Sequence, residues 1–211
     1  DLVERANTLL VLDVPDSRER IEAALEAAIG GGALTCVNVA GRLLVAEPRM
    51  HQMESDLAGI FRAPGHSNPH FSGDEVEALI ANPARPLNDD QRRAVLAALR
   101  HNLVLISGGA GVGKTYTVGA ISQLYAERGR NVILAAPTGK AAKRLEEVTG
   151  REACTIHRLL GYRGSTFLRG PDNPIEADVV IVDELSMLCV PIAWRLFGAI
   201  DLSRTAVVLV G

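Results

Sequence analysis

The sequence predicts an α/β fold in which helices cover a parallel sheet, preceded by a small, mostly helical domain. Two observations support this prediction. From residue 87 onward, short apolar runs alternate with helical patterns, and such runs are typical of strands buried on both faces of a parallel sheet. One run, residues 103–107, leads directly into a glycine-rich segment at 108–115 and then into a helical pattern, which is the context of a phosphate-binding loop.

The composition indicates a globular chain without a membrane segment. Of the 211 residues, 47% are hydrophobic and 22% are charged, as in ordinary globular domains. No apolar run approaches the roughly 18 residues that a membrane helix needs, so no membrane partner is expected. Cys36, Cys154 and Cys189 lie far apart and form no C-x-x-C pair, which argues against a zinc site or a disulfide framework and favours free thiols in the cytoplasm.

Charge is divided unevenly along the chain. Residues 1–84 carry 6 Lys and Arg residues against 13 Asp and Glu residues, whereas residues 85–211 carry 16 against 12. This change predicts a domain boundary near residue 85, with the basic balance on the later part. We therefore expect a small domain over 1–62, a linker rich in Pro and Gly over 63–86, and an α/β domain over 87–211.

The first domain is expected to contain a helix, a hairpin and a second helix. The first helix, 18–29, ends at three glycines, and two short strands at 34–38 and 42–46 form the hairpin. The second helix covers 48–62 and has an apolar side. This order is typical of a small winged-helix-like module, but its acidic charge favours a packing or protein-contact role over DNA binding.

The second domain is expected to alternate helices and strands from its start. Asn88 can cap the first helix, 89–101, because asparagine is a preferred N-cap residue. Ligands should bind beyond the carboxyl ends of the parallel strands. Further helices are expected at 74–81 within the linker and at 113–127, 139–148, 155–161 and 191–200, further strands at 103–107, 131–136, 179–182 and 205–210, and a Gly- and Pro-rich loop at 164–174.

Residues 108–115 read G-G-A-G-V-G-K-T and predict a site for nucleotide phosphates. Glycines allow positive φ and let backbone N–H groups approach the phosphates, and the following helix directs its positive dipole end at them. Lys114 would add charge at the β- and γ-phosphates, and the Thr115 hydroxyl would complete the coordination of Mg²⁺. The residues expected to bind the nucleotide here are Gly108, Gly109, Ala110, Gly111, Val112, Gly113, Lys114, Thr115 and Tyr116.

An acidic pair follows the fully apolar run at 179–182. Asp183 can hold Mg²⁺ through water, and Glu184 can orient or deprotonate the attacking water. Taken alone, an apolar run that ends in Asp-Glu is more often a strand followed by a solvated turn. After a phosphate-binding loop, the pair indicates hydrolysis as well as binding.

Two further segments complete a set of ordered motifs. They are A-P-T-G-K-A-A-K-R-L at 136–145, which by composition alone would be a helix start with surface lysines, and T-I-H-R-L-L-G-Y at 155–162. Together with Gln91, the loop and the acidic pair, they resemble the RecD-like DNA helicases of superfamily 1, both the free-standing bacterial type and the alpha subunit of exodeoxyribonuclease V. The resemblance is dense over 87–211 and implies that this region is a RecA-like ATPase domain.

The resemblance also implies roles for individual residues in an ATP site. Gln91 would read the adenine of ATP through the donor and acceptor of its side-chain amide. Lys114, Asp183 and Glu184 would be the catalytic residues, with Mg²⁺ at Thr115 and Asp183.

For single-stranded DNA, the resemblance implies contacts from Pro137, Thr138 and Lys140, with His157 in the next DNA-side motif. Hydroxyl, ammonium and backbone N–H groups at a helix start suit phosphates without reading sequence. For His157, a packing histidine held by a hydrogen bond is an equally open interpretation.

The function implied by the resemblance is ATP-dependent unwinding of DNA in repair and recombination, with 5′ to 3′ movement on single-stranded DNA. Other subunits of a nuclease complex are candidate partners. The chain stops before the second RecA-like domain of that family, so by itself it is not expected to unwind DNA. Two alternatives stay open, the helicase part of a conjugative relaxase and a nucleotide-gated binding module without motor activity, although Glu184 argues against the second.

Overall fold

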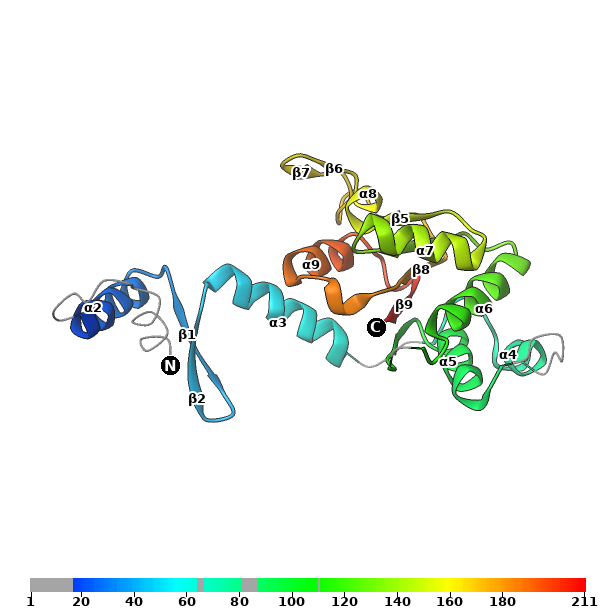
Figure 1. The fold of residues 1–211 in the computed structure, drawn as a ribbon, viewed down its shortest axis with the longest axis horizontal. Coiled ribbons are helices and arrows are strands. Elements are labelled where there is room, and N and C mark those ends of the chain that lie inside the picture. The colour runs from blue at the N-terminus through cyan, green and yellow to red at the C-terminus, as the bar shows by residue number, and fades with distance from the viewer. Residues whose placement is uncertain (1–16, 64–66, 81–86, 110) are drawn as a thin grey trace. The chain divides into compact units, whose positions relative to one another are not determined.

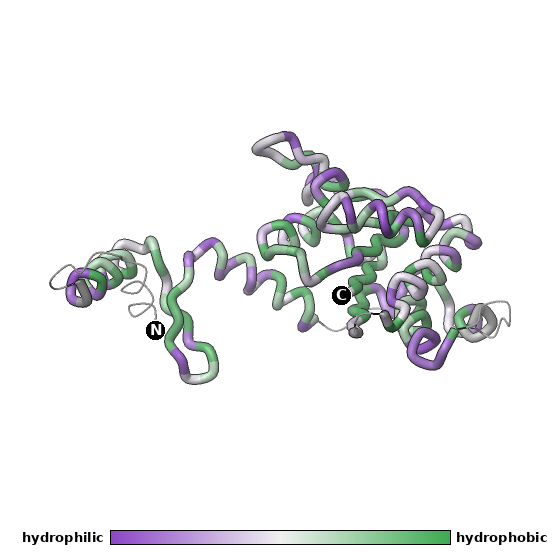
Figure 2. Tube along the Cα trace, viewed as in Figure 1, coloured by the Kyte–Doolittle hydropathy of each residue, from purple (hydrophilic) through white to green (hydrophobic). Residues whose placement is uncertain are grey.

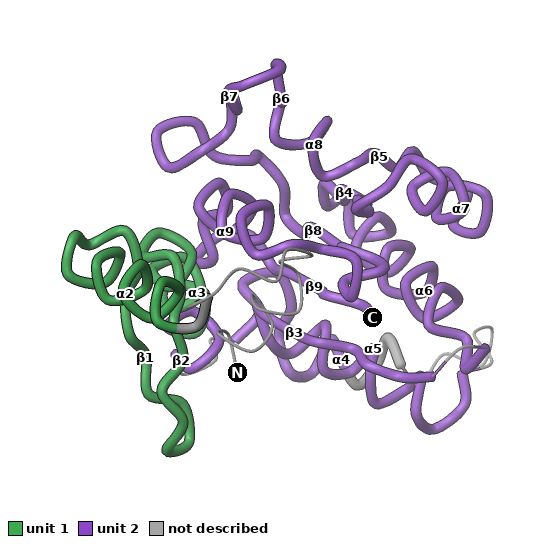
Figure 3. The backbone as a smooth tube through the Cα atoms, turned by 60° about the vertical axis from the view of Figure 1, so that its left-hand side comes forward, with its two compact units in different colours: residues 1–58 green, residues 59–211 purple. Residues whose placement is uncertain are grey.

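The computed structural model describes residues 17–63, 67–80, 87–109 and 111–211. The chain divides into two compact units, residues 1–58 and 59–211 (Figure 3). Each unit has its own arrangement of secondary structure, and the two are described separately below.

The first unit contains a helix, a hairpin and most of a second helix. The turn of the hairpin consists of Ala40 and Gly41, whose φ values are 50° and 80°. Positive φ at both central residues is typical of the tight turns that match the twist of paired strands. The predicted order of elements is present, whereas the likeness to a winged helix stays a prediction. The described elements are α2 (Ser17–Gly30), β1 (Thr35–Val39), β2 (Arg42–Ala46) and α3 (Pro48–Arg62), which runs past the boundary between the units.

The second unit is built on a sheet of five strands, and every neighbouring pair in it is parallel; Figure 3 labels these strands. The strands at its centre are continuously apolar and buried at every residue, and they appear as a hydrophobic centre in Figure 2. The predicted α/β fold with a parallel sheet is confirmed. In sheet order, the strands are β3 (Leu103–Ile106), β9 (Ala206–Val210), β8 (Val179–Val182), β4 (Val132–Ala136) and β5 (Ala153–Thr155).

Helices cover this sheet, with α9 on one side of the strands and α6 on the other (Figures 1 and 3). On α6, the side chains of Val118, Ile121, Leu124 and Tyr125 recur every three or four residues and are at most 1% exposed, so they form the stripe that packs on the sheet. Among the described residues, no helix has both the length and the apolar character that crossing a membrane requires. The helices are α4 (Gly73–Ile80), α5 (Asp89–Arg100), α6 (Lys114–Glu127), α7 (Gly139–Thr149), α8 (Ile156–Leu159) and α9 (Val190–Gly198).

Two short elements differ from the sequence prediction. The expected helix at 155–161 is shortened to α8, because β5 pairs with β4 up to Thr155. A small hairpin, β6 (Tyr162–Arg163) and β7 (Thr166–Phe167), extends into the expected loop. Strands of two or three residues are too short to give a periodic pattern, so the sequence carries no signal for them.

The segment predicted as a linker contributes to the core of the second unit. Helix α4 packs against α5, and Val76 is 1% exposed within the same hydrophobic cluster as the helices on the sheet. Residues 67–80 of the segment predicted as a linker thus include side chains that pack in the second unit. The physical reason is a set of polar contacts between residues far apart in sequence, which local composition does not reveal.

Asn68 is the centre of these contacts and is only 4% exposed. Its backbone N–H donates to the carbonyl of Arg100 at 2.8 Å, and its side-chain Nδ2 donates to the carbonyl of Ala98, also at 2.8 Å. The last carbonyls of a helix lack partners inside the helix, so Asn68 satisfies two carbonyls at the end of α5. Nδ2 also donates to the Tyr125 hydroxyl, and burial raises the pKa of Tyr125 well above its ordinary value.

Glu75 provides a second link, from α4 to the end of α6. Its carboxylate accepts hydrogen bonds from the backbone N–H and the hydroxyl of Ser72, both at 2.9 Å, and it pairs with Arg128. The Ser72 bonds first, and then Arg128, lower the pKa of Glu75 to about 2.

Replacing Asn68 with alanine should destabilise the second unit. The change removes the hydrogen bonds that Nδ2 donates to the Ala98 carbonyl and the Tyr125 hydroxyl, and leaves the 3.3 Å bond between these two groups in place. Loss of two such buried bonds costs roughly 1–3 kcal/mol. Urea unfolding followed by fluorescence of Trp194, the single tryptophan, measures the loss. Arg92→Ala, an exposed change on α5, is the control, and equal midpoints for the two variants would contradict the role of Asn68.

The Glu75 contacts should make stability depend on pH. Because the folded pKa is depressed, the contribution is present above the unfolded value of 4.5 and is lost as pH falls towards about 2. Glu75→Gln should therefore lower the free energy of unfolding near neutral pH, and its difference from wild type should shrink as the pH is lowered. Urea unfolding at three pH values tests this, and a difference that did not vary with pH would contradict it.

Candidate nucleotide-binding site

The glycine-rich segment joins the end of β3 to the start of α6. Gly111 and Gly113 have φ values of 80° and 86°, a conformation that is costly for residues with a Cβ. Gly113 is the N-cap of α6 and makes no side-chain hydrogen bond to the first N–H groups of the helix. These N–H groups can therefore donate to an anion. Of the predicted loop residues, Ala110 lies outside the described residues.

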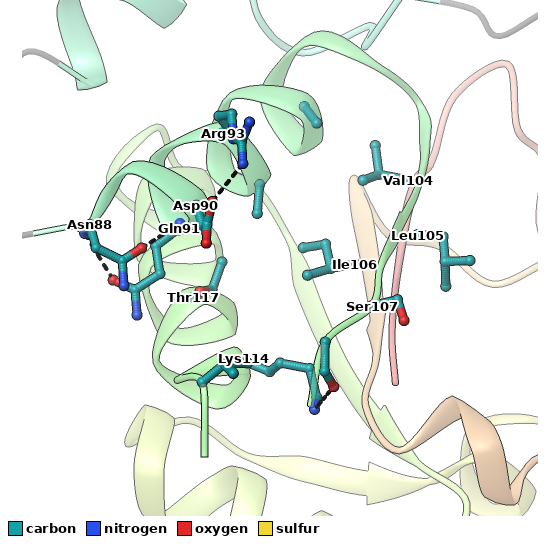
Figure 4. A pocket seen from close by; sticks show the side chains of 14 residues that line it. Asn88, Asp90, Gln91, Arg93, Val104, Leu105, Ile106, Ser107, Lys114 and Thr117 are labelled. Atoms are coloured by element: carbon teal, nitrogen blue, oxygen red, sulfur yellow. Dashed lines mark hydrogen bonds and ion pairs between the residues drawn. The ribbon is translucent and has the colours of Figure 1, made fainter. Parts of the chain in front are cut away.

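Lys114 is folded back over this loop (Figure 4). Its Nζ donates to the carbonyls of Gly108 at 2.6 Å and Gly109 at 2.9 Å. The ammonium group is therefore held where the loop and the start of α6 converge. Thr115 is half-buried in the first turn of α6, and Tyr116 is 47% exposed beside it.

A pocket of about 680 Å³ opens beside the loop. Its walls come from the first turns of α5, from β3 and from the start of α6. The structure thus brings Gln91 to the loop residues Gly108, Val112 and Lys114, although 17 or more positions separate it from them in the chain. Pocket residues that the sequence interpretation did not assign to the site are Asn88, Asp90, Arg93, Ala94, Ala97, Val104, Leu105, Ile106, Ser107 and Thr117.

Gln91 takes part in a capping box at the start of α5. Its backbone N–H donates to Asn88 Oδ1 at 2.9 Å, and its Oε1 accepts from the Asn88 N–H at 3.1 Å. A Cβ placed on Gly113 would lie 2.6 Å from Gln91 Nε2, so this side chain lies directly against the turn of the loop. The pattern N-x-x-Q before a helix is a variant of the capping-box signature and was available in the sequence.

The acidic pair lies at the carboxyl end of β8. The Asp183 N–H donates to the Ala135 carbonyl at 3.0 Å, and Asp183 Oδ1 accepts from the Glu184 N–H at 2.9 Å. Glu184 has a left-handed backbone with φ 57°, which is uncommon for a residue other than glycine. The Asp183 carboxyl is therefore fixed within the end of the sheet, while the chain turns sharply at Glu184.

Electrostatics connect Asp183 with the loop. Burial raises the pKa of Asp183 above its ordinary value, and the nearby charge of Glu184 acts in the same direction. The Glu184 N–H and the positive charges of Lys114 and Arg144 oppose this shift. The carboxyl thus feels the charge of Lys114 across the sheet edge, and Arg144 on α7 is a basic neighbour that the sequence interpretation did not include in the site.

The residues predicted to contact DNA follow the next two strands at the same sheet edge. Pro137 and Thr138 come directly after β4, and the Thr138 hydroxyl caps α7 by accepting from the Ala141 N–H at 3.2 Å. Lys140 is exposed in the first turn of α7. Because carboxyl ends of parallel strands meet at one edge, these residues lie at the same end of the sheet as the loop.

His157 is exposed on α8 and packs among rings instead of the core. Its ring lies 5.4 Å from that of Tyr162 and 6.2 Å from that of Phe167, measured between centroids. The guanidinium of Arg195 on α9 lies 5.3 Å from the centre of the Phe167 ring. These contacts connect the β6–β7 hairpin with α8 and α9, while His157 stays exposed.

Comparison with known proteins shows the family to which the chain belongs. Residues 91–211 match the AAA domain family. The "ATP-dependent RecD2 DNA helicase" of Deinococcus radiodurans is 38% identical over 165 residues, which cover 78% of this chain and 23% of that protein. The "RecBCD enzyme subunit RecD" of Mycolicibacterium smegmatis is 32% identical over an alignment that covers 99% of this chain and 48% of that protein.

A third relative, the "ATP-dependent DNA helicase PIF3" of Trypanosoma brucei brucei, is 36% identical over 66% of this chain and 16% of its own length. The chain thus spans less than half of the length of each of these relatives. The match to the family covers more than half of the chain and includes the loop, the acidic pair and Gln91. The chain therefore belongs to the AAA domain family and is a RecD-like member of helicase superfamily 1.

Proposed function

We propose that this chain supplies the ATP site and part of the DNA surface of an ATP-dependent DNA helicase. The observation that carries the proposal is the position of Lys114 and the Asp183–Glu184 pair at one edge of a parallel sheet, where the register brings the ends of β3 and β8 to the same level. There, burial raises the pKa of Asp183, and the charge of Lys114 opposes this rise. A site that only held a nucleotide would need the lysine but not a carboxylate that activates water. The names of the relatives support the same conclusion.

In this proposal, the phosphates of ATP lie against the start of α6. The N–H groups of the first turn donate to them, and the Lys114 ammonium exchanges the Gly108 and Gly109 carbonyls for phosphate oxygens. Backbone donors in a fixed turn need no rearrangement when charge develops on the phosphate, which is why such loops stabilise the transition state.

The residues present fit a magnesium ion. The Thr115 hydroxyl and the Asp183 carboxylate are hard oxygen ligands, which Mg²⁺ prefers together with water and phosphate oxygens. When bound, the ion would neutralise charge on the β- and γ-phosphates. The buried position of Asp183, whose backbone is fixed to β4, would keep its carboxylate in one place.

Glu184 is proposed to orient and deprotonate the attacking water. Its N–H is bonded to Asp183 Oδ1, so its backbone position is linked to the residue proposed to hold the metal. The backbone turns sharply between these two residues, and the proposal gives one carboxylate to the metal and the other to water.

Single-stranded DNA is proposed to run over the sheet edge beyond β4 and β5, contacting Pro137, Thr138, Lys140 and His157. Exposed Lys140 would neutralise a phosphate, and exposed His157 would stack on a base. Movement in the 5′ to 3′ direction, DNA repair and recombination, and association with the subunits of a nuclease complex are proposed from the RecD-like relatives, one of which is named as a RecBCD subunit.

Two substitutions test the ATP site in a DNA-stimulated ATPase assay on the full-length protein. Lys114→Ala should weaken ATP binding by about 10- to 100-fold, because one charge-assisted hydrogen bond is lost. Glu184→Gln should still bind ATP but turn it over roughly 10²- to 10⁴-fold more slowly, as expected for loss of a general base.

The matched control for Glu184→Gln is Glu176→Gln, the same change at an exposed position before the opposite end of β8. This control should keep wild-type turnover. Turnover that did not respond to single-stranded DNA would refute the helicase proposal and favour a nucleotide-gated binding module.

The DNA surface is tested by the salt dependence of binding. Lys140→Ala should weaken binding to single-stranded DNA whatever its sequence, and the slope of log affinity against log salt should fall by about 0.7 for one lost phosphate contact. Arg204→Ala removes an exposed positive charge just before β9, at the other end of the sheet, and should leave the slope unchanged. Equal slopes for wild type and Lys140→Ala would contradict the proposed path of the DNA.

A further inference from the structure

The capping box at the start of α5 lies at the mouth of the nucleotide pocket. Asn88 and Gln91 both line this pocket, and Figure 4 shows their side chains next to each other at its rim. The two residues exchange hydrogen bonds, Gln91 N–H to Asn88 Oδ1 at 2.9 Å and Asn88 N–H to Gln91 Oε1 at 3.1 Å. A pair that would ordinarily only start a helix is therefore part of a ligand site.

The bond from the Asn88 backbone N–H decides which way the Gln91 amide faces, and the bond that the Asn88 side chain accepts holds the helical turn on which both groups lie. A backbone N–H can be satisfied by the oxygen of an amide but not by its NH₂ group, so Oε1 is held towards Asn88. Nε2 is consequently directed to the loop, where it lies 2.6 Å from the position that a Cβ on Gly113 would take. No hydrogen bond from Nε2 is found among the residues that the structure describes, so both of its N–H donors and one lone pair of Oε1 stay available.

The fixed orientation matters for recognition of a purine. Adenine presents an acceptor, N7, beside a donor, the N6 amino group, and one amide can pair with both. Guanine presents two acceptors, N7 and O6, at the same edge. An amide whose oxygen is held in place turns that oxygen towards one of these acceptors, and two acceptors cannot form a hydrogen bond. An amide that could turn over would lose part of its preference for adenine.

We propose that Asn88 is a positioning residue for base recognition, which holds the first turn of α5 so that Gln91 presents its amide to the nucleotide base in one orientation. The proposal rests on the proposed ATP site. Asn88 acts through Gln91 and has no assigned contact with the phosphates, so it should affect the base part of binding alone.

The alternative is that Asn88 only stabilises α5. A capping box of the same kind lies at the start of α4, where Ser72 and Glu75 exchange side-chain and backbone hydrogen bonds. Neither residue lines the nucleotide pocket. Loss of that cap should therefore lower stability without changing nucleotide selectivity, which provides a matched control.

The experiment is calorimetric titration of the full-length protein with three ligands, namely non-hydrolysable analogues of ATP and of GTP, and inorganic tripolyphosphate. Asn88→Ala should weaken binding of the ATP analogue by up to about fivefold, because the roughly 1 kcal/mol that the N-cap contributes to the first turn of α5 would then have to be supplied when the base binds. Binding of tripolyphosphate should be unchanged. The preference for the ATP analogue over the GTP analogue should fall by a similar factor. Asn88→Ser should restore it, since serine also accepts from the third N–H of the helix.

Two controls distinguish a role of Asn88 in positioning Gln91 from an effect on protein stability and from an effect on the ATP site as a whole. Ser72→Ala should keep wild-type affinity for all three ligands. Gln91→Ala should remove the preference for adenine, and adding Asn88→Ala to it should change nothing further, because the two residues act as a unit.

Equal weakening of all three ligands by Asn88→Ala, or no weakening of any, would overturn the role of Asn88 while leaving the ATP site standing. A wild-type protein that bound none of the three would overturn the proposed function and this inference with it.

Discussion

Parallel pairing of β3, β9 and β8 is the constraint on which the rest of this structure depends. The register aligns Ile106 with Val210 and Val182 with Leu209, so the loop after β3 and the acidic pair after β8 leave the sheet at nearly the same level. Only β9 lies between them, and two strand spacings amount to roughly 10 Å. That separation suits the proposed triphosphate and Mg²⁺, and the charge of Lys114 reaches Asp183 across it. If the register slipped by two residues, every motif would persist and the site would be lost.

The sequence predicted best where a pattern is long or a motif has fixed spacing. The central strands are continuously apolar because both faces are covered, and the glycine-rich loop shows its chemistry in its residue types. The division of the chain was harder. Prolines and glycines around residues 67–80 suggested a linker, but Asn68 binds carbonyls at the end of α5, 30 residues later. Contacts between single side chains far apart in sequence leave no local pattern, so composition could not reveal them.

In the candidate site, too, motifs could be predicted from the sequence, whereas contacts between residues far apart in the chain could not. The residues at the phosphates were named from the sequence, and the structure gathers the described ones at one sheet edge. What the sequence did not give is how they are supported: the bonds between Asn88 and Gln91, the contact of Gln91 with Gly113, and the influence of Arg144 on Asp183. The first of these has a capping-box pattern in the sequence, but that pattern by itself indicates only the start of a helix. The other two depend on how α5, α6 and α7 pack, which no spacing in the chain encodes.

The left-handed backbone of Glu184 has a consequence for how such a chain changes over generations. A left-handed residue with a Cβ costs on the order of 1–2 kcal/mol relative to glycine, and asparagine is also better tolerated there. Mutation of Glu184 to glycine or asparagine would therefore increase stability, and selection for stability alone would favour these replacements. If Glu184 has the proposed role in hydrolysis, a lineage that keeps glutamate at this turn does so for its chemistry, and loss of the carboxylate would be the first sign that a descendant no longer hydrolyses ATP.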